Sequence, residues 1–267
     1  MNLPARSRSF DGRRALVTGG SRGVGRAIVE QLAASGADVA FSYRREKDAA
    51  AKVAAEVSGL GRRVQAIAAD LSNADAPAML YRECLGGLGV PDLLVCNAGV
   101  ASRGLAAAAT SDVEYERLWR VHFMSNVALT REAVPAMREA GSGALVYVSS
   151  TYSVLRPAGA APYAAAKSAL EAFAEVLAKE ERAYGIRVNT VAPGLVATDM
   201  GDRLVRAGGE HFRASDIDDQ APFGRVCRPS DVADVVLFAL SGSSSYLTGQ
   251  RLVVDGGGWP GLNAPTI

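Results

Sequence analysis

The stretch Ala15-Leu16-Val17-Thr18-Gly19-Gly20-Ser21-Arg22-Gly23-Val24-Gly25 decides the fold of this chain, because it joins a short apolar run to a glycine-rich turn. The helical pattern Arg26-Ala27-Ile28-Val29 follows directly. Glycines let the backbone approach phosphate groups, and the free N–H groups and the dipole at a helix start favour an anion. Glycines in isolation also serve as plain turns. A strand, a glycine turn and a helix start in this order predict a diphosphate site.

Short apolar runs alternate with longer helical patterns along most of the chain. Near-continuous apolar runs are typical of strands buried on both faces. Their alternation with helices, together with right-handed crossovers, predicts an α/β single-domain Rossmann fold: a doubly wound, seven-stranded parallel sheet with helices on both faces. The expected strands lie at 15–17, 39–41, 64–69, 93–95, 144–148, 188–191 and 252–254, and the expected helices at 23–35, 46–58, 74–86, 112–140, 162–184 and 230–240.

The domain boundaries follow from where this alternation begins and ends. Residues 1–11 are expected to form an N-terminal extension, residues 12–258 the domain, and residues 259–267 a C-terminal tail. Residues 195–225 show no clean strand pattern and follow the sixth strand, at the edge where open α/β sheets bind ligands. Long excursions in compact domains are usually functional or disordered, so we expect a mobile substrate lid rather than a plain surface insertion.

The composition excludes several classes of protein. With 267 residues, 49% of them hydrophobic, the chain can bury a sizeable core. A net charge of +1 gives no electrostatic case for a nucleic-acid or membrane partner. The cysteines Cys84, Cys96 and Cys227 are odd in number and lack metal-ligand spacing, so we expect no metal and a reducing compartment. Without a secretion signal or a membrane-spanning run, a cytoplasmic location is expected.

The end of the second expected strand, Phe41-Ser42-Tyr43-Arg44-Arg45, indicates which dinucleotide binds. NAD sites commonly place an acid there to hold the ribose 2′-hydroxyl, but Asp38 lies at the other end of this strand. An arginine binds a 2′-phosphate in a fork, which an acid would repel. Arg22 in the glycine turn can face the same phosphate. A solvated charge run at 44–47 is the alternative, yet two converging basic groups favour NADP(H) over NAD(H).

Tyr163-Ala-Ala-Ala-Lys167, at the start of a strong helix pattern, carries the candidate chemistry. Residues four apart share one helix face, so the phenol and the ammonium project together. A free tyrosine has a pKa of about 10, which a nearby lysine and the positive nicotinamide of an oxidised cofactor would lower. This spacing in isolation marks an ordinary exposed pair. Here Ser150 lies 13 residues before Tyr163, at the end of the fifth expected strand.

The T-G-x-x-x-G-x-G spacing and the Ser150, Tyr163 and Lys167 spacing resemble those of the short-chain dehydrogenase/reductase family, and of its 3-oxoacyl-(acyl carrier protein) reductase group. The resemblance extends over roughly residues 12–257. It implies an NADP(H)-dependent oxidoreductase that reduces a ketone to a secondary alcohol. Tyr163 is then the general acid in reduction and the base in oxidation, Ser150 hydrogen-bonds the substrate oxygen, and Lys167 binds the nicotinamide ribose and tunes Tyr163.

Further family motifs recur at strand ends, where a generic turn is the alternative. Asp70-Leu71 resembles the pair that contacts adenine, and Asn97-Ala98-Gly99 the triplet that supports the sheet and the adenosine ribose. The segment 193–198 resembles the nicotinamide clamp, in which the Val196 backbone and the Thr198 hydroxyl hold the carboxamide. The cofactor-binding residues so implied are Gly19, Ser21, Arg22, Gly23, Val24, Gly25, Tyr43, Arg44, Asp70, Leu71, Asn97, Ala98, Gly99, Tyr163, Lys167, Pro193, Gly194, Val196 and Thr198.

One position departs from the family pattern. The V-N-(L/F)-x-(S/G) context reads Val121-His122-Phe123-Met124-Ser125, so His122 stands where a catalytic asparagine is expected; Asn126 lies one helical turn later. The family asparagine helps to hold a water that links the lysine to solvent. Histidine donates or accepts and titrates near neutrality. His122 therefore replaces asparagine in this relay, or is a filler beside three sufficient catalytic residues; lost activity is a third interpretation.

Two other functions stay open. One is an alcohol dehydrogenase that acts on a steroid, a sugar or a secondary metabolite, and the other is a non-catalytic NADP(H)-binding sensor, because fold alone does not decide activity. The glycine spacing and the lack of a second substrate domain disfavour a sugar-nucleotide epimerase. The expected partner is a small carbonyl or alcohol substrate. In relatives the last strand and the helices near 112–140 and 162–184 form subunit contacts, which implies a homotetramer or homodimer.

Overall fold

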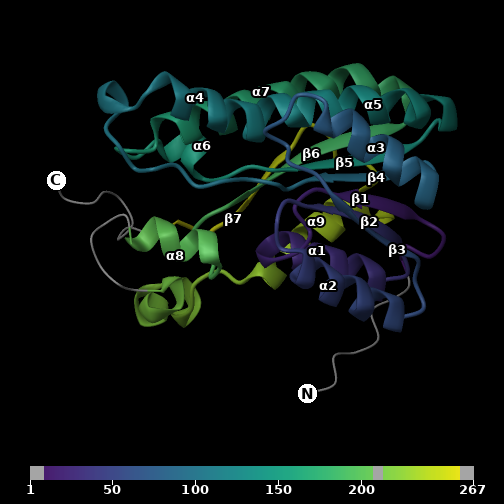
Figure 1. Cartoon of the computed structure of the whole chain (residues 1–267), viewed down its shortest axis with the longest axis horizontal. Coiled ribbons are helices and arrows are strands. Elements are labelled where there is room, and N and C mark those ends of the chain that lie inside the picture. Colours follow the sequence, from purple (N-terminus) through teal and green to yellow (C-terminus); the bar gives the residue numbers. More distant parts are fainter. Residues whose placement is uncertain (1–8, 207–212, 259–267) are drawn as a thin grey trace.

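A computed structural model describes residues 9–206 and 213–258, and a parallel sheet runs through its centre (Figure 1). The strands are β1 (Arg14–Val17), β2 (Asp38–Tyr43), β3 (Val64–Ala68), β4 (Leu93–Cys96), β5 (Gly143–Val148), β6 (Ile186–Pro193) and β7 (Arg251–Val254). They pair in the order β3-β2-β1-β4-β5-β6-β7, every pair parallel. The strand order reverses direction at β1 and β4, which is the switch point of a doubly wound sheet. The predicted fold class is confirmed.

Helices cover both faces of this sheet. In Figure 1, α1, α2 and α9 lie on one side of the strands, and α3, α4, α5 and α7 lie on the other. A crossover between parallel strands needs a dozen or more residues and usually contains a helix. The helices are α1 (Gly23–Ala34), α2 (Lys47–Gly59), α3 (Ala76–Gly87), α4 (Asp112–Trp119), α5 (Ser125–Ala140), α6 (Tyr152–Leu155), α7 (Ala161–Glu181), α8 (Asp199–Arg206) and α9 (Pro229–Leu240).

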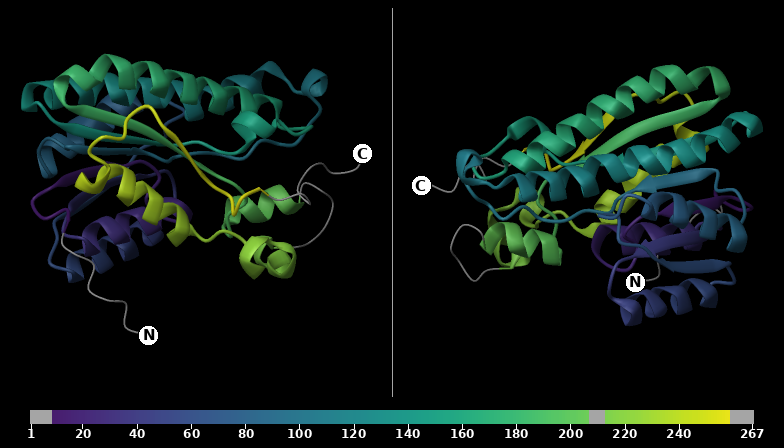
Figure 2. Two further views of the ribbon diagram at one scale, coloured as in Figure 1. Left: turned by 180° about the vertical axis from the view of Figure 1, so that it is seen from behind. Right: turned by 45° about the horizontal axis from the view of Figure 1, so that its top comes forward.

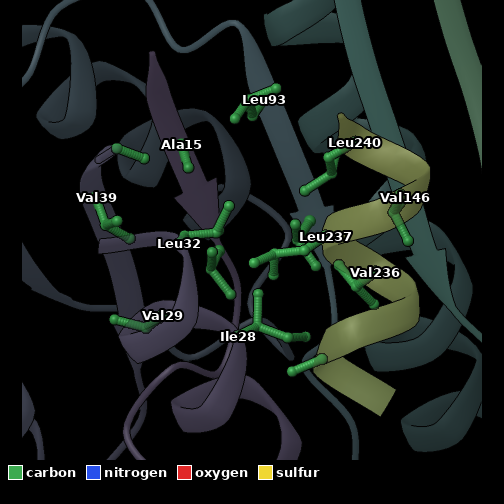
Figure 3. Close-up of a cluster of buried hydrophobic side chains, with 14 of the residues drawn as sticks. Ala15, Ile28, Val29, Leu32, Val39, Leu93, Val146, Val236, Leu237 and Leu240 are labelled. Carbon is green, nitrogen blue, oxygen red and sulfur yellow. The ribbon is translucent and has the colours of Figure 1, made fainter. Parts of the chain in front are cut away.

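Alternating side chains of the strands fill two separate cores. Leu93 points to the core under α1 and α9, whereas Leu94, the next residue of β4, points to the core under α3, α5 and α7. Figure 3 shows Ile28 and Leu32 of α1 meeting Leu237 of α9 below the strands. Burying such a side chain contributes roughly 1.5–3 kcal/mol. Burial on both faces explains why the strands read as near-continuous apolar runs.

The helix predicted over residues 112–140 is interrupted. Between α4 and α5 the chain forms one π-helical turn, η2 (Arg120–Met124), and His122 lies in it. Ser125, the first residue of α5, donates its hydroxyl to the Val121 carbonyl of this turn at 2.8 Å. A π turn inserts one residue without leaving the helical backbone, so apolar periodicity did not reveal it. Such turns are frequent at functional sites.

The chain ends differ in part from the predicted boundaries. Phe10 is 2% exposed in the core under α1, and its N–H donates to the Ser35 carbonyl at 3.0 Å. The predicted extension 1–11 therefore includes residues of the packed domain, because the aromatic side chain of Phe10 is buried in the core. Residues 1–8 of that extension and the predicted tail 259–267 lie outside the described residues.

The segment predicted as a lid projects from one end of the sheet (Figure 2). It contains α8 and the short helices η4 (Ala214–Gln220) and η5 (Pro222–Gly224), and 207–212 lie outside the described residues. A small apolar cluster of Ala214, Ala221 and Val226 holds its second half together. One bridge between Val196 and Cys227 ties both ends of the segment to each other. Its mobility stays a prediction.

Within residues 9–206 and 213–258, no helix is long and apolar enough to cross a membrane. The same described ranges hold no cluster of His, Cys, Asp and Glu side chains that could bind a metal ion.

Candidate active site

The glycine turn between β1 and α1 leaves room for a phosphate group rather than for side chains. Gly19 has a φ of +71°, which disfavours a side chain, and a Cβ at Gly25 would lie 2.1 Å from the Gly19 carbonyl oxygen. The first turn of α1 reads Gly23-Val24-Gly25-Arg26. The Arg26 N–H donates to the Arg22 carbonyl at 3.1 Å, whereas the N–H groups of Gly23, Val24 and Gly25 have no acceptor within the helix and are free to bind an anion. The turn therefore fits the diphosphate of a dinucleotide.

The Asn97-Ala98-Gly99 triplet joins β4 to this turn. The Asn97 side-chain amide donates to the Thr18 carbonyl at 3.0 Å, and the Thr18 hydroxyl accepts the N–H groups of Asn97 and Ala98 at 2.9 and 3.0 Å. These bonds cross the switch point of the sheet. They fix the two strand ends that face the cleft, so Asn97 supports the sheet as the resemblance implied.

Ser150, Tyr163 and Lys167 converge although they come from different elements. Ser150 follows β5, while Tyr163 and Lys167 lie in the first two turns of α7. Lys167 is 3% exposed, and its Nζ donates to the Val148 carbonyl at 2.7 Å and lies 5.8 Å from the centroid of the Tyr163 ring. All three residues line one cavity of about 620 Å³ at the carboxyl edge of the sheet.

Protonation in this cavity differs from the sequence-based expectation. Burial raises the pKa of Tyr163 to about 12, and a hydrogen bond with Ser150 offsets only part of that rise. Burial lowers the pKa of Lys167 to about 8, which the charge of Glu171 partly opposes. In the protein without a cofactor, Lys167 therefore does not lower the pKa of Tyr163. Desolvation dominates, and the Lys167 Nζ is bonded to the Val148 carbonyl. A neutral phenol at physiological pH can donate a proton.

His122 lies on the cavity, whereas Asn126 points into its own helix and donates to the His122 carbonyl at 2.8 Å. His122 Nε2 lies 2.8 Å from the Val100 carbonyl oxygen and 3.2 Å from the Val100 N–H. The shorter distance favours a proton on Nε2. His122 Nδ1 then accepts from no partner among the described residues. The imidazole ring stands edge-on to the Tyr163 ring, with centroids 5.0 Å apart.

His122 does not titrate near neutrality, contrary to the expectation from its residue type. Burial, with 1% of the residue exposed, lowers its pKa well below the ordinary value, and the charge of Lys167 lowers it further. The imidazole is neutral at physiological pH. It can hold Val100 or a water in place, but an imidazolium is not available there to pass on a proton.

The residues that the sequence analysis assigned to the site line the same cavity. It extends from the glycine turn, past the ends of β2 and β3, to α7 and the start of the lid segment. The predicted residues on it are Gly19, Ser21, Arg22, Gly23, Val24, Gly25, Tyr43, Arg44, Asp70, Leu71, Asn97, Ala98, Gly99, His122, Ser150, Tyr163, Lys167, Pro193, Gly194, Val196 and Thr198.

Three carboxylates that the sequence analysis missed also line the cavity: Glu30, Glu46 and Asp199. Glu46 Oε1 and Asp199 Oδ2 each lie 3.4 Å from Arg22 Nη1. The turn after β2 brings Glu46 to the cavity. An acidic side chain therefore lies close to the end of the second strand, where the sequence analysis expected none. The side chains of Arg22, Glu46 and Asp199 are all exposed to solvent, and such pairs are weak. A 2′-phosphate would compete with Glu46 and Asp199 for Arg22.

The hydroxyl of Thr198, expected to bind the nicotinamide, also starts the lid helix. It accepts the Gly201 N–H at 3.1 Å, as a residue that caps a helix does. It lies 3.3 Å from the Val196 carbonyl as well. A Ser, Thr, Asp or Asn before a helical run signals such a cap, but the glycines in this segment obscured the helix.

A second cavity of about 740 Å³ adjoins the first under the lid segment. Both cavities are lined by Ser150, Gly194 and Leu204. Apolar and aromatic side chains make up much of the wall of the second one: Tyr152, Leu155, Leu195, Leu204, Phe223, Val226, Val235 and Val254. The charged residues on it are Arg225, Asp231, Asp234 and Asp255.

A doubly wound sheet, a glycine turn at its switch point and a Tyr–Lys pair in the cavity define the Rossmann-fold oxidoreductases as the class of protein. A family model described as enoyl-(acyl carrier protein) reductase matches residues 19–258. The chain belongs to the short-chain dehydrogenase/reductase family.

Curated relatives align over nearly the whole chain. The uncharacterized oxidoreductase YmfI of Bacillus subtilis is 37% identical, over 91% of this chain and 97% of the relative. Versicolorin reductase stcU of Emericella nidulans is 36% identical, over 93% and 96%. The 3-oxoacyl-(acyl-carrier-protein) reductase FabG of Staphylococcus aureus is 33% identical, over 91% and 96%. The resemblance to the 3-oxoacyl reductase group is thereby confirmed.

Solved structures of the family superpose closely. A blue fluorescent protein from a metagenomic library, in complex with NADPH, has a TM-score of 0.83 and 33% identity, over 93% of this chain and 98% of that chain. A 7α-hydroxysteroid dehydrogenase complexed with NADH and 7-oxo glycochenodeoxycholic acid has a TM-score of 0.85 and 27% identity, over 97% and 98%. Structural relatives thus hold either cofactor.

Proposed function

We propose that the protein reduces a ketone to a secondary alcohol with NADPH, with Tyr163 as the general acid. The observation that carries this proposal is that one cavity joins Ser150, Tyr163 and Lys167 to the glycine turn. A non-catalytic sensor would need the turn but not the tyrosine and lysine that line the same cavity. A dehydrogenase reaction is the same chemistry in reverse, and the cofactor balance decides its direction.

The side chains have distinct tasks in this reaction. A bound nicotinamide supplies the hydride that reaches the carbonyl carbon. Ser150 donates a hydrogen bond to the carbonyl oxygen and stabilises the charge that develops there. Tyr163 gives its proton to that oxygen, and the Lys167 cation stabilises the resulting phenolate. The raised pKa of Tyr163 keeps the proton in place until the charge develops.

The form of the cofactor is inferred from the arginines around the ribose end of the cavity. Within the described part of the chain no ion pair is seen for Arg44, so its guanidinium is available to a 2′-phosphate. Arg22 can join it after exchanging Glu46 or Asp199 for the phosphate. One similar structure holds NADPH and another holds NADH, so the relatives do not discriminate between the two cofactors. The proposal of NADPH therefore rests on the two arginines.

We expect Arg44→Ala to weaken NADPH binding about 10- to 100-fold, which corresponds to one charge-assisted hydrogen bond, and to leave NADH binding nearly unchanged. Fluorescence titration of both cofactors measures this ratio. Arg45→Ala is the matched control: it removes an adjacent arginine that is absent from the described wall of the cavity. Equal losses for NADPH and NADH in Arg44→Ala would contradict the assignment to the 2′-phosphate.

The substrate is inferred from the second cavity. Its apolar and aromatic wall next to Ser150 suits a hydrophobic ketone with a bulky or long substituent better than a sugar. FabG of Staphylococcus aureus and versicolorin reductase are reductases by name, which supports reduction as the physiological direction.

His122→Asn is expected to keep most of the activity, because an asparagine amide can donate to the Val100 carbonyl and accept the Val100 N–H that His122 Nε2 faces. His122→Phe removes the bond from Nε2 to the Val100 carbonyl and is expected to lower kcat about 10-fold. The pH dependence of kcat should be alike in wild type and His122→Asn between pH 5 and 7.5, since the imidazole stays neutral. A titration in that window that disappears in His122→Asn would contradict this role.

The assay that tests the proposal follows NADPH and NADH oxidation with a panel of β-ketoesters, diketones, quinones and steroid ketones, including a β-ketoacyl thioester. We expect turnover with NADPH well above that with NADH. Tight NADPH binding without turnover on any ketone would favour the sensor. Faster oxidation of a secondary alcohol by NADP⁺ than reduction of any ketone would favour the alcohol dehydrogenase.

A further inference from the structure

A largely buried ion pair joins β7 to α7 directly behind Ser150. Arg251 Nε lies 3.0 and 3.1 Å from the two carboxylate oxygens of Glu171. Glu171 is 9% exposed, and 25% of the Arg251 side chain is exposed. Removing charges from water is costly unless each is paired and hydrogen-bonded, so such a pair is weak evidence for stability in itself. Its other contacts indicate a different role.

The pair reaches the peptide carbonyl of Ser150. Arg251 Nη2 donates to the Ser150 carbonyl oxygen at 3.3 Å and to Ser153 Oγ at 3.2 Å. Ser153 is 1% exposed, and its hydroxyl lies 2.8 Å from both the Ser150 carbonyl and Glu171 Oε1. An arginine, a serine and a glutamate therefore hold the backbone of the residue whose hydroxyl lines the cavity. Fixing the carbonyl of a peptide unit limits the directions in which the side chain can point.

Glu171 also lies on the same face of α7 as Tyr163 and Lys167. Tyr163, Lys167 and Glu171 are spaced four residues apart, which aligns them along the helix. The titratable groups around Lys167 are Cys96 of β4, His122 of η2, and Tyr163 and Glu171 of α7, with Arg251 behind Glu171. The negative charge of Glu171 opposes the burial that lowers the pKa of Lys167 to about 8.

We propose that Arg251, Glu171 and Ser153 are positioning residues of the active site, which hold Ser150 in its reactive orientation and place the Glu171 carboxylate one helical turn from Lys167. This inference rests on the proposed function. Arg251 and Ser153 act on Ser150 through hydrogen bonds to its carbonyl oxygen. Glu171 acts on Ser150 by holding Arg251, and on Lys167 through its negative charge. The network connects β7, the last strand of the sheet, to the chemistry at the end of β5.

The charge on Lys167 is tested without any substrate. NMR of protein labelled with ¹³C at the lysine ε-carbon follows each ammonium group over pH 6 to 11, and Lys167→Met assigns the resonance. We expect Glu171→Gln to lower the apparent pKa of Lys167 by about one unit, since a nearby opposite charge favours the charged form. An unchanged titration would overturn this half of the inference. The chain has the lysines Lys47, Lys52, Lys167 and Lys179 to resolve.

The orientation of Ser150 is tested by kinetics. We expect Arg251→Met to lower kcat about 10- to 100-fold, the cost of a misplaced reacting group, with a smaller change in KM and none in NADPH affinity. The double variant Arg251→Met/Glu171→Gln removes both charges and leaves neither unpaired. It should stay slow. Recovery of the wild-type kcat in the double variant would show that Arg251→Met lowers kcat only by leaving the Glu171 charge unpaired, and would overturn the positioning role.

A second ion pair on the same helix is the matched control. Glu181, which is 1% exposed, pairs with Arg138 of α5 and lies at the far end of α7 from Tyr163. We expect Glu181→Gln to lower Tm without changing kcat or the Lys167 titration. If no ketone is turned over, the NMR titration still tests the network. If wild type turns over and Arg251→Met is equally fast, the network fails while the proposed function stands.

Discussion

Replacing Tyr163 by phenylalanine is expected to lower kcat for ketone reduction about 10²- to 10⁴-fold, the usual contribution of a general acid. NADPH affinity should stay unchanged, because the ring keeps its packing against His122 and Tyr152, with centroids 5.0 and 6.2 Å away. Only the hydroxyl is lost. Stopped-flow measurement of NADPH oxidation, with a separate fluorescence titration of NADPH, distinguishes loss of chemistry from loss of binding.

The pH dependence of the wild-type enzyme belongs to the same prediction. Lys167 has a pKa of about 8 in the protein, lowered by burial, so its cation is present below pH 8 and lost above it. The phenolate formed when Tyr163 gives up its proton needs that cation. The kcat for reduction should therefore fall as the pH rises through about 8.

Tyr81→Phe is the control for this change. Tyr81 is 5% exposed on α3, and its hydroxyl has no partner among the described residues. Removing it makes the same chemical change away from the cavity. We expect no loss of kcat. A Tyr163→Phe variant that keeps more than a tenth of the wild-type kcat would remove Tyr163 from the role of proton donor.

Gly25→Ala is expected to abolish measurable NADPH binding and to destabilise the protein. The new Cβ would lie 2.1 Å from the Gly19 carbonyl oxygen and 2.5 Å from Asn97 Nδ2, so the glycine turn and the β4 end must both move. Overpacking of this kind costs about 1–3 kcal/mol or more, which lowers Tm by several degrees. The diphosphate amides would be displaced as well. Differential scanning fluorimetry with and without NADPH measures both effects.

Gly86→Ala is the matched control for this helical glycine. Gly86 is exposed in α3, and a Cβ there meets nothing within 4 Å. Alanine favours the helix over glycine by up to about 1 kcal/mol. We expect a slightly higher Tm and unchanged NADPH binding. A Gly25→Ala variant that bound NADPH like wild type would mean that the turn does not cradle the diphosphate.

Local patterns in the sequence determined the fold class and the members of the candidate site. The periodicity of apolar residues in strands and helices depends only on residues close together in the sequence. The glycine turn likewise binds a diphosphate through its own backbone. Once the strands are parallel, their carboxyl ends must share one edge. Residues at those ends, such as Asp70 and Asn97, therefore met Ser150 and Tyr163 in one cavity without any knowledge of their side-chain contacts.

Only the tertiary structure decided how these residues are charged and what they touch. The neutral imidazole of His122 and the high pKa of Tyr163 come from burial, which depends on everything packed around them. Glu46 reached Arg22 through the course of a turn, and Arg251 reached Ser150 across the sheet, over a separation of 101 residues. Desolvation and contacts between distant segments exist only after the chain has folded, so no local pattern of residues records them.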